Sequence, residues 1–334
     1  MRRLPETAQL LYAELLDQVR AAENNLYLPI GGSFVSKTIG TGKYWYLQRD
    51  EKGSRTQTYL GPETPELLQQ IRTAKEQQVD LKRRRQLVSM LIAGGAASES
   101  SRFTAVLEVL AQSFVFRLGG VLVGTHAFVC YANMLGVHFE GETLRTADID
   151  VAENAKISVA VAREGSLDIL DRLKSIEPRF SAVPELDPRD PSTSLKVRGS
   201  DLRVDFLTTT RRGVTTRPVP LPHLKVAAQP LEGLDYLIEK TAKAVVVGGG
   251  GILVNVPLPA RYGLHKLWVA KNRPVTEQTK ARKDQAQARQ VIEVLLADRP
   301  DDVQEAVVAL KSRPKMWKRV QKEIDVLTAP RRGV

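Results

Sequence analysis

The sequence predicts an α/β protein of the α+β type, in which a mixed β-sheet is flanked by helices. Strand-like runs rich in β-branched residues are mixed along the chain with longer segments of helical periodicity. The apolar share of 43% is that of an ordinary globular protein, so a sizeable core can form. At 334 residues, the chain has room for more than one domain.

The first hundred residues predict a small unit of helices and a meander. Apolar residues in segment 6–22 recur at the spacing of one helix face, and the motif Thr64-Pro65-Glu66 is typical of a helix start. We expect that second helix to end at Gly94-Gly95, and we place a domain boundary in the small, polar segment that follows, so that the first domain covers residues 1–98. Between the helices, short glycine-containing loops join three strand-like runs, which predicts a three-stranded meander: Ser33–Ile39, Lys43–Gln48 and Arg55–Leu60.

Two features of this unit have alternative explanations. Aromatic residues of the meander stand among lysines and arginines, a pattern that suits a nucleic-acid-binding face or a small sheet packed on a helix. The run Lys82–Arg85 is either a solvated helix face or a contact for RNA or DNA.

The middle of the chain predicts a mixed sheet with covering helices, over residues 99–260. Segment Pro178–Ser194 contains four prolines and is predicted as a loop, and Gly248–Gly251 as a hairpin turn, because a strand and not a helix follows it. Residues 261–334 predict a basic helical region. The expected helices of the core are Phe103–Phe116, Ala127–Leu135, Ser166–Ile176 and Leu231–Lys240, and the expected strands are 121–123, 145–152, 200–209, 244–247 and 252–256.

A strand, a tight turn and a helix at residues 121–135 predict an anion-binding site. Gly124 lets a phosphate approach the backbone, the Thr125 hydroxyl can bond a phosphate oxygen, and the first N–H groups of the helix are free to bind an anion. The following strand carries Asp148 and Asp150, whose side chains share one face with Cα atoms about 6.6 Å apart. Two carboxylates beside a phosphate site suit Mg²⁺ and a nucleoside triphosphate.

A third acid completes the predicted site. In the strand over 200–209, Arg203 and Asp205 share a face. Three acids on adjacent strands could hold two Mg²⁺ ions about 3.5–4 Å apart. Asp148 and Asp150 would hold the metals, and Asp205 would complete the site of the metal nearest the acceptor hydroxyl or take its proton. We predict these three aspartates as catalytic and metal-binding residues. Arg145 is either a phosphate contact or an ion-pair partner of the neighbouring acids.

The same motifs resemble the polymerase-β-like nucleotidyltransferase superfamily. Its signature is a hydrophobic residue before Gly-Gly or Gly-Ser, then Asp-x-Asp/Glu, then a lone acid in a later strand. This sequence has Leu122-Val-Gly-Thr125, Thr146-x-Asp-Ile-Asp150 and Val204-Asp-Phe206. Residues about 100–300 are also similar to a bacterial nucleotidyltransferase-domain family, on the matching tail segments Pro259–Leu267 and Lys280–Ala288. The resemblance implies a mixed sheet flanked by helices, an NTP donor and Mg²⁺, with Mn²⁺ as an alternative. Thr125 departs from it, since Gly or Ser is usual there.

The C-terminal helices supply further candidates for contacts with the triphosphate, namely Lys266, Lys283 and Asp284. On a helical wheel, Asp284 and Gln287 lie on the apolar side of their helix. Inward polar groups need partners, so the pair either faces the active-site cleft or braces the structure through hydrogen bonds. We interpret His126 as a supporting residue, not as a base.

Charge and composition constrain the partners. The formal net charge is +11, and residues 261–334 hold 17 Lys and Arg against 9 Asp and Glu, which favours a polyanionic partner such as nucleic acid or else a solvated basic surface. The single cysteine, Cys130, excludes an internal disulfide and fits a reducing compartment. No apolar run is long enough to cross a bilayer, and we see no signal peptide, so a cytoplasmic protein is expected.

The sequence therefore predicts an enzyme that moves a nucleoside monophosphate from an NTP to a hydroxyl. The acceptor is RNA, such as a tRNA 3′ end as in toxin-type relatives, or alternatively a protein or a small molecule such as an antibiotic. A different class of function is a non-catalytic, nucleic-acid-binding or antitoxin-like module on the same scaffold. The intact acids Asp148, Asp150 and Asp205 argue against that alternative.

Overall fold

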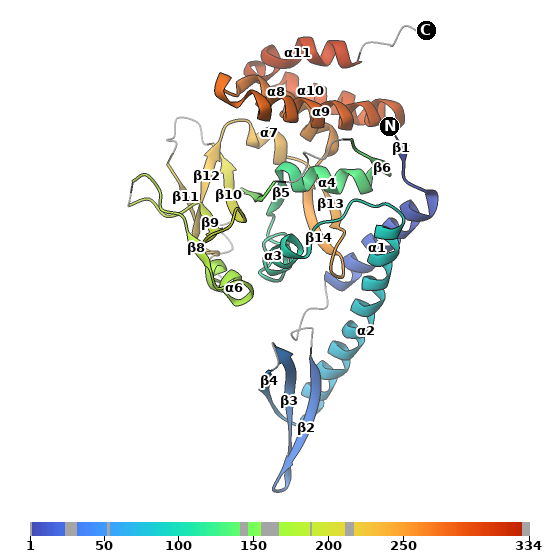
Figure 1. Cartoon of the computed structure of the whole chain (residues 1–334), viewed down its shortest axis with the longest axis vertical. Helices are drawn as coiled ribbons and strands as arrows, with labels where there is room; N and C mark the ends of the chain where they lie inside the picture. The colour runs from blue at the N-terminus through green and yellow to red at the C-terminus, as the bar shows by residue number, and fades with distance from the viewer. Residues whose placement is uncertain are drawn as a thin grey trace.

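The computed structural model describes residues 2–23, 32–51, 54–140, 146–154, 167–187, 189–210 and 217–328. Figure 1 shows an elongated molecule with the C-terminal helices at one end, the mixed sheet in the middle and a small separate sheet at the other end. None of the described helices combines the length and the apolar character that a membrane span requires.

The central sheet has seven strands within the described residues. Its main path runs β11-β12-β10-β7-β5. Strand β9, which also pairs with β8, pairs with the first residues of β10, whereas β12 pairs with the last residues of β10. Strand β10 is parallel to both β7 and β12, whereas β5 is antiparallel to β7 and β9 is antiparallel to β10. The strands are β5 (Val121–Val123), β7 (Asp148–Glu153), β8 (Phe180–Ala182), β9 (Ser194–Val197), β10 (Arg203–Thr209), β11 (Val219–Leu221) and β12 (Val226–Leu231).

The two central strands are buried on one side and carry acids on the other. Alternate residues of β7 and β10 enter the main hydrophobic core, where they are no more than 1% exposed: Ile149, Val151, Val204 and Phe206. Because neighbouring side chains of a strand point to opposite faces, Asp148, Asp150 and Asp205 lie together on the other face.

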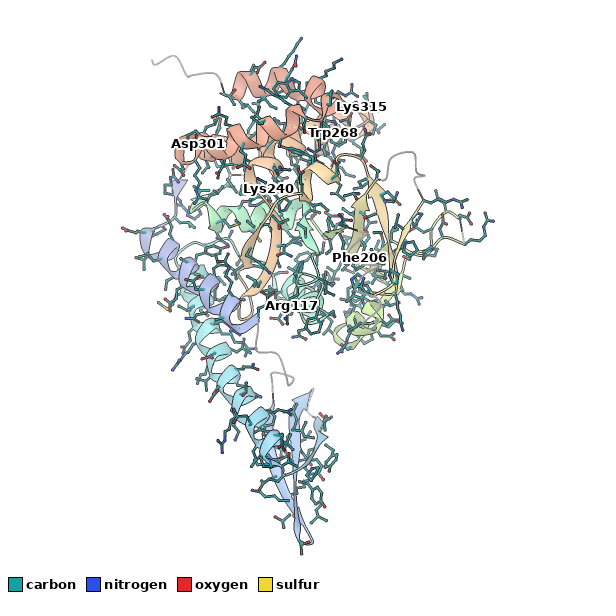
Figure 2. The ribbon with its side chains drawn as sticks, turned by 180° about the vertical axis from the view of Figure 1, so that it is seen from behind. Arg117, Phe206, Lys240, Trp268, Asp301 and Lys315 are labelled. Carbon is teal, nitrogen blue, oxygen red and sulfur yellow. The ribbon has the colours of Figure 1, made fainter. Side chains whose placement is uncertain are left out.

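Helices surround this sheet and form the C-terminal end of the molecule, which Figure 2 shows from the reverse side with Trp268 among them. Helices α8 to α11 pack on one another, and α8 also contacts α7. The helices of the core are α3 (Ser101–Gln112), α4 (Gly124–Met134), α6 (Ile169–Ile176) and α7 (Leu234–Ile238); the C-terminal ones are α8 (Pro259–Asn272), the 3₁₀ turn η2 (Val275–Glu277), α9 (Gln278–Asp298), α10 (Pro300–Lys311) and α11 (Pro314–Thr328).

The N-terminal helices are anchored on a hairpin of the middle region. Helices α1 (Glu6–Glu23) and α2 (Pro65–Ala93) share a second hydrophobic core with the hairpin of β13 (Thr241–Val246) and β14 (Ile252–Pro257). Helix α2 then extends away from this core and carries the meander at its far end (Figure 1). The meander strands are β2 (Ser33–Ile39), β3 (Gly42–Glu51) and β4 (Ser54–Pro62), and a short pair joins β1 (Arg2–Arg3) to β6 (Val137–His138).

The predicted fold class is confirmed, and so is the four-glycine hairpin turn, in which Gly249 and Gly251 have positive φ angles. The expected division at residues 98 and 260 stays a prediction.

Several element predictions were wrong in detail. The proline-rich segment 178–194 is not only a loop, because β8 lies within it and β9 begins at its last residue. Strands β11 and β12 were missed, since both contain proline, which sequence patterns associate with loops. Helix α3 ends at Gln112 and not at Phe116, because Phe114 adopts a φ of 61° and the N–H of Val115 bonds back to the carbonyl of Leu110.

Candidate active site

The three predicted aspartates meet on one face of the sheet. Strands β7 and β10 are adjacent and parallel, and their register pairs Asp150 with Asp205 and Asp148 with Arg203. Neighbouring strands lie about 4.8 Å apart, so four charged side chains crowd into one small patch. The alternation of side chains predicted which residues share a face within each strand. The structure shows that the two strands are neighbours.

Asp205 is the most buried of the three acids, with 7% of its surface exposed. The Ser194 hydroxyl on β9 donates a short hydrogen bond to its Oδ1, and the Arg203 Nε donates to its Oδ2 over 2.8 Å. Burial raises the pKa of Asp205, and these two donors oppose the rise. Ser194 could not be identified from the local sequence, because eleven residues separate it from the acid that it contacts.

Arg203 links two of the acids. Its guanidinium lies 2.7 Å from Oδ2 of Asp205 and 3.7 Å from Oδ1 of Asp148. The alternation along β10 indicated that Arg203 shares the face of Asp205. Only the structure shows that Arg203 also pairs with Asp148 on the neighbouring strand β7. Arg203 thus neutralises part of the acidic patch.

The surroundings of Asp150 disfavour the ionised form of its carboxyl group. Burial raises its pKa to about 6, and the carboxylates of Asp205 and Asp148 add to the rise, while Lys266 and His126 lower it. A cation among these carboxylates would relieve the repulsion. Their oxygens are the donors that Mg²⁺ prefers, so the donor chemistry fits this ion. As the described side chains stand, however, no three His, Cys, Asp or Glu residues are arranged to hold a metal ion.

The turn before helix α4 brings backbone close to Asp150. Gly124 has a φ of +67°, and a Cβ atom at this position would lie 2.3 Å from Oδ2 of Asp150. Only glycine combines this backbone conformation with so close an approach. Helix α4 begins at Gly124, three residues earlier than predicted, and no side chain caps its N-terminus. The first N–H groups of α4, including that of the buried Thr125, are therefore available to an anion beside the acids.

A buried pair supports this turn from behind. His126 Nδ1 lies 2.7 Å from Oε1 of Glu99, and both side chains are 2% exposed. His126 has no hydrogen-bond partner for Nε2 among the described residues, and its proximity lowers the pKa of Asp150. These contacts agree with a supporting role for His126. Glu99, in the predicted linker, was not identified from the sequence.

Helices α8 and α9 reach the same turn. The fully buried hydroxyl of Tyr262 lies 3.1 Å from the Gly124 carbonyl oxygen and 3.0 Å from Oε1 of Gln287. Asp284, 2% exposed, receives hydrogen bonds of 2.6 Å from Lys266 Nζ and Arg273 Nε. Both inward polar residues of α9 are thus engaged by neighbouring side chains, as expected of the hydrogen-bonded brace.

The predicted lysines lie within electrostatic range of the acids. Lys266 lowers the pKa of Asp150, as noted above. Burial lowers the pKa of Lys283, as does the charge of Lys266, whereas Asp284 and Asp148 oppose this. Asp284 therefore holds Lys266 near the acidic patch instead of facing it as a free carboxylate. Arg145, the remaining predicted contact, lies outside the described residues.

Comparison with known families agrees with this geometry. A family model described as Nucleotidyltransferase matches residues 101–311, which include all three aspartates and the α8–α9 brace. A second model, described as a domain of unknown function (DUF6788), matches residues 7–70, over helix α1 and the meander. No curated protein and no solved structure matches the chain.

Proposed function

The chain belongs to the nucleotidyltransferase family matched by residues 101–311, and from this premise we propose that it is a Mg²⁺-dependent enzyme that transfers a nucleoside monophosphate from an NTP to a hydroxyl. The observation that carries the proposal is the joining of Asp148, Asp150 and Asp205 on adjacent parallel strands beside the uncapped start of α4.

Each group of residues has its own role in the proposed reaction. The N–H groups at Gly124 and Thr125 would bind the triphosphate, and Lys266 and Lys283 would neutralise its charge. Asp148, Asp150 and Asp205 would hold Mg²⁺, which when bound stabilises charge on the attacking oxygen and the leaving pyrophosphate.

Asp205 is best placed to act on the acceptor side. Asp150 on β7 lies between Asp205 and the turn at the start of α4, so Asp205 is farther from the proposed triphosphate site. The raised pKa of Asp205 suits a group that takes a proton from the hydroxyl. For a cation to bind between Asp148 and Asp205, the guanidinium of Arg203 would have to move away from both carboxylates.

RNA is the acceptor that the remaining surface favours. One face of the meander packs on α2: Leu47 is 3% exposed, and Lys75 of α2 lies 5.9 Å from the Trp45 ring centroid. On the opposite face the Tyr46 and Tyr59 rings are 5.4 Å apart, and Tyr59 is 54% exposed. One face of the sheet thus packs on a helix, and the other leaves aromatic rings accessible, which supports the proposal of a nucleic-acid-binding face.

The open face has the composition of a single-strand-binding surface. Tyr44 lies 6.3 Å from Tyr59, and Lys37 Nζ lies 4.8 Å from the Tyr46 ring centroid. Exposed aromatic rings stack on bases, and neighbouring cations attract the phosphate backbone, as does the net charge of +11.

The acceptor is tested with fractions of a cell lysate. The purified protein is incubated with each α-³²P-labelled NTP and Mg²⁺, together with total RNA, total protein or the small-molecule filtrate. We expect label in RNA with one or more NTPs and none from γ-³²P-labelled NTP. Label confined to protein or to the filtrate would preserve the reaction type and exclude the RNA acceptor.

A further inference from the structure

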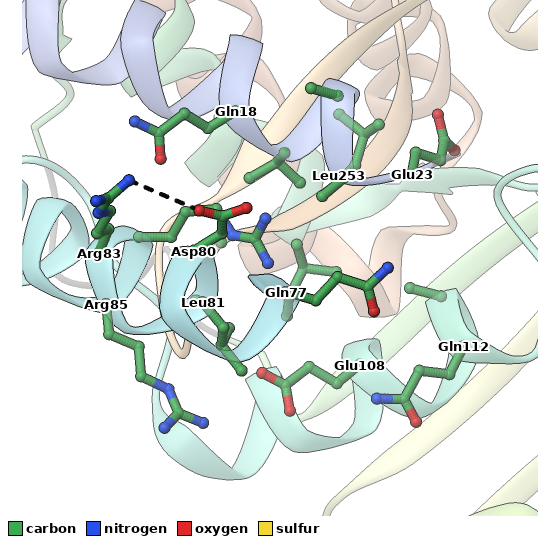
Figure 3. A pocket seen from close by; sticks show the side chains of 18 of the residues that line it. Gln18, Glu23, Gln77, Asp80, Leu81, Arg83, Arg85, Glu108, Gln112 and Leu253 are labelled. Atoms are coloured by element: carbon green, nitrogen blue, oxygen red, sulfur yellow. Dashed lines mark ion pairs between the residues drawn. The ribbon is translucent and has the colours of Figure 1, made fainter. Parts of the chain in front are cut away.

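A second cavity lies away from the acidic patch. It measures about 520 Å³ and is enclosed by α1, α2, α3 and the glycine turn between β13 and β14 (Figure 3). Phe116 and Arg117 line it, and they precede strand β5, whereas the candidate active site begins at Gly124 after that strand. The cavity is thus a separate site, and its size is in the range of small-molecule pockets.

The unusual group in this cavity is Arg84. It is 7% exposed, whereas the three other cations of the run Lys82–Arg85 are exposed. Across the part of the chain that the structure describes, no carboxylate lies within ion-pair distance of Arg84, and its Nε has no hydrogen-bond partner. Burial lowers the pKa of Arg84, and Asp80 opposes this only from beyond ion-pair distance, so an anion bound in the cavity would stabilise the buried charge.

The carboxylates that line the cavity do not supply that anion. The charge of Asp80 raises the pKa of Arg84, but the ion pair of Asp80, over 3.8 Å, is with Arg83. Glu23 lies 3.3 Å from Lys243. Glu108 also lines the cavity; burial raises its pKa, and the charge of Arg85 opposes the rise.

Two further arginines increase the positive surplus. Arg85 and Arg117 also line the cavity, and neither has an ion-pair partner among the described side chains, although Arg117 lies 5.3 Å from the Phe114 ring. Three guanidinium groups that form no ion pair among the described side chains favour a multiply charged anion, and their planar donors match phosphate oxygens.

The rest of the lining suits an organic body attached to the phosphate. The wall is apolar on the sides of α1, α2 and the hairpin, where it is formed by Val19, Leu81, Ile252 and Leu253. The side chains of Gln18 and Gln112 lie at the same cavity and offer hydrogen bonds to a polar ring or sugar (Figure 3).

We propose that this cavity binds a small phosphate monoester of about the size of a nucleoside monophosphate, with its phosphate on Arg84. Arg85 and Arg117 approach the phosphate from the rim, and the apolar wall holds the body of the ligand. The site links the N-terminal helices to the core that carries the aspartates, so its occupant stabilises the junction between them.

The test is calorimetric titration of the full chain in EDTA with AMP, UMP, inorganic phosphate, adenosine and a short single-stranded RNA. We expect the nucleoside monophosphates to bind more tightly than inorganic phosphate, and adenosine not to bind. Arg84→Met should weaken monophosphate binding by about 10- to 100-fold, the loss of a charged hydrogen-bonded contact. Arg72→Met is the matched control, because Arg72 is an exposed arginine of the same helix α2 that does not line the cavity, and it should bind as the wild type does.

Stability separates a ligand contact from a structural role. Without ligand, Arg84→Met should be at least as stable as the wild type, because it removes an uncompensated buried charge. A less stable Arg84→Met with unchanged monophosphate affinity would overturn the proposal. So would wild-type protein that binds none of the monophosphates, or that binds only the RNA. If Arg84→Met does not fold, the double variant Arg85→Gln with Arg117→Gln provides the same affinity test.

The titration is independent of the proposed transferase activity. Asp150→Asn should bind the monophosphate as the wild type does, since Asp150 belongs to the other site and the buffer contains no free metal. Failure of the transfer assay would therefore leave this proposal standing, and failure of the titration would leave the transferase proposal standing.

Discussion

Asp150→Asn is expected to stabilise the protein while it removes the proposed activity. The pKa of Asp150 rises from an ordinary value of 3.8 to about 6 in the fold, chiefly through burial and the carboxylates of Asp205 and Asp148. The folded state therefore holds the proton more tightly than the unfolded chain does. The stability associated with this group is fully present below pH 3.8 and is lost as the pH rises through about 6.

The expected gain follows from these two pKa values. At pH 8, the ionised carboxylate costs the folded state about 3 kcal/mol, and at pH 5 it costs about half as much. Asparagine has nearly the same shape and no charge, so Asp150→Asn should gain about 2–3 kcal/mol at pH 8 and about half of that at pH 5. Urea unfolding in EDTA at both pH values measures the difference.

Asp148→Asn is the matched control, because the same chemical change falls on a side chain that is 48% exposed. It should alter the free energy of unfolding by about 0.5 kcal/mol or less. Equal or lower stability of Asp150→Asn at pH 8 would refute the reasoning, as would a gain that does not shrink at pH 5.

Three other changes test separate parts of the account. Gly124→Ala should lower the free energy of unfolding by about 1–2 kcal/mol, because alanine disfavours the positive φ at this position, and should reduce turnover, because the new methyl group displaces Asp150. Urea unfolding and transfer rates measure the two effects, and normal turnover would contradict the second. Burial raises the pKa of Glu153 from 4.5 to about 8, so the stability of the wild type falls as the pH rises through that range, and Glu153→Gln should flatten this dependence between about pH 5 and 8. Urea unfolding curves over a pH series measure it, and the same slope for both proteins would count against this burial effect. Tyr59→Ala should weaken single-stranded RNA binding by about 1–3 kcal/mol in filter-binding assays, and unchanged affinity would rule out stacking on the open meander face.

Much of the candidate site could be predicted from the sequence, because local patterns encode it. Alternation along one strand put Asp148 and Asp150 on one face, and the Gly124-Thr125 turn followed an apolar run. The same alternation placed Arg203 beside Asp205. These inferences needed only the period of a strand and the conformational freedom of glycine.

The remaining features depend on contacts between distant segments. Ser194 contacts Asp205 only because β9 pairs with β10, and the proline-rich sequence before Ser194 predicted a loop. Tyr262 reaches Gly124 across 138 residues. Arg84 is likewise one of four consecutive cations, and only the packing of α1, α2 and α3 shows that it alone is buried.

The central claim is tested most directly by transfer of label from an α-³²P-labelled NTP. Wild-type protein and the variant Asp148→Asn with Asp150→Asn are each incubated with labelled NTP and total RNA, in Mg²⁺ and in EDTA. Circular dichroism and urea unfolding establish that the variant is folded. We predict labelled product only from wild-type protein in Mg²⁺. Equal labelling by a folded double variant would contradict the assignment of the acids, and labelling that persists in EDTA would contradict the requirement for metal.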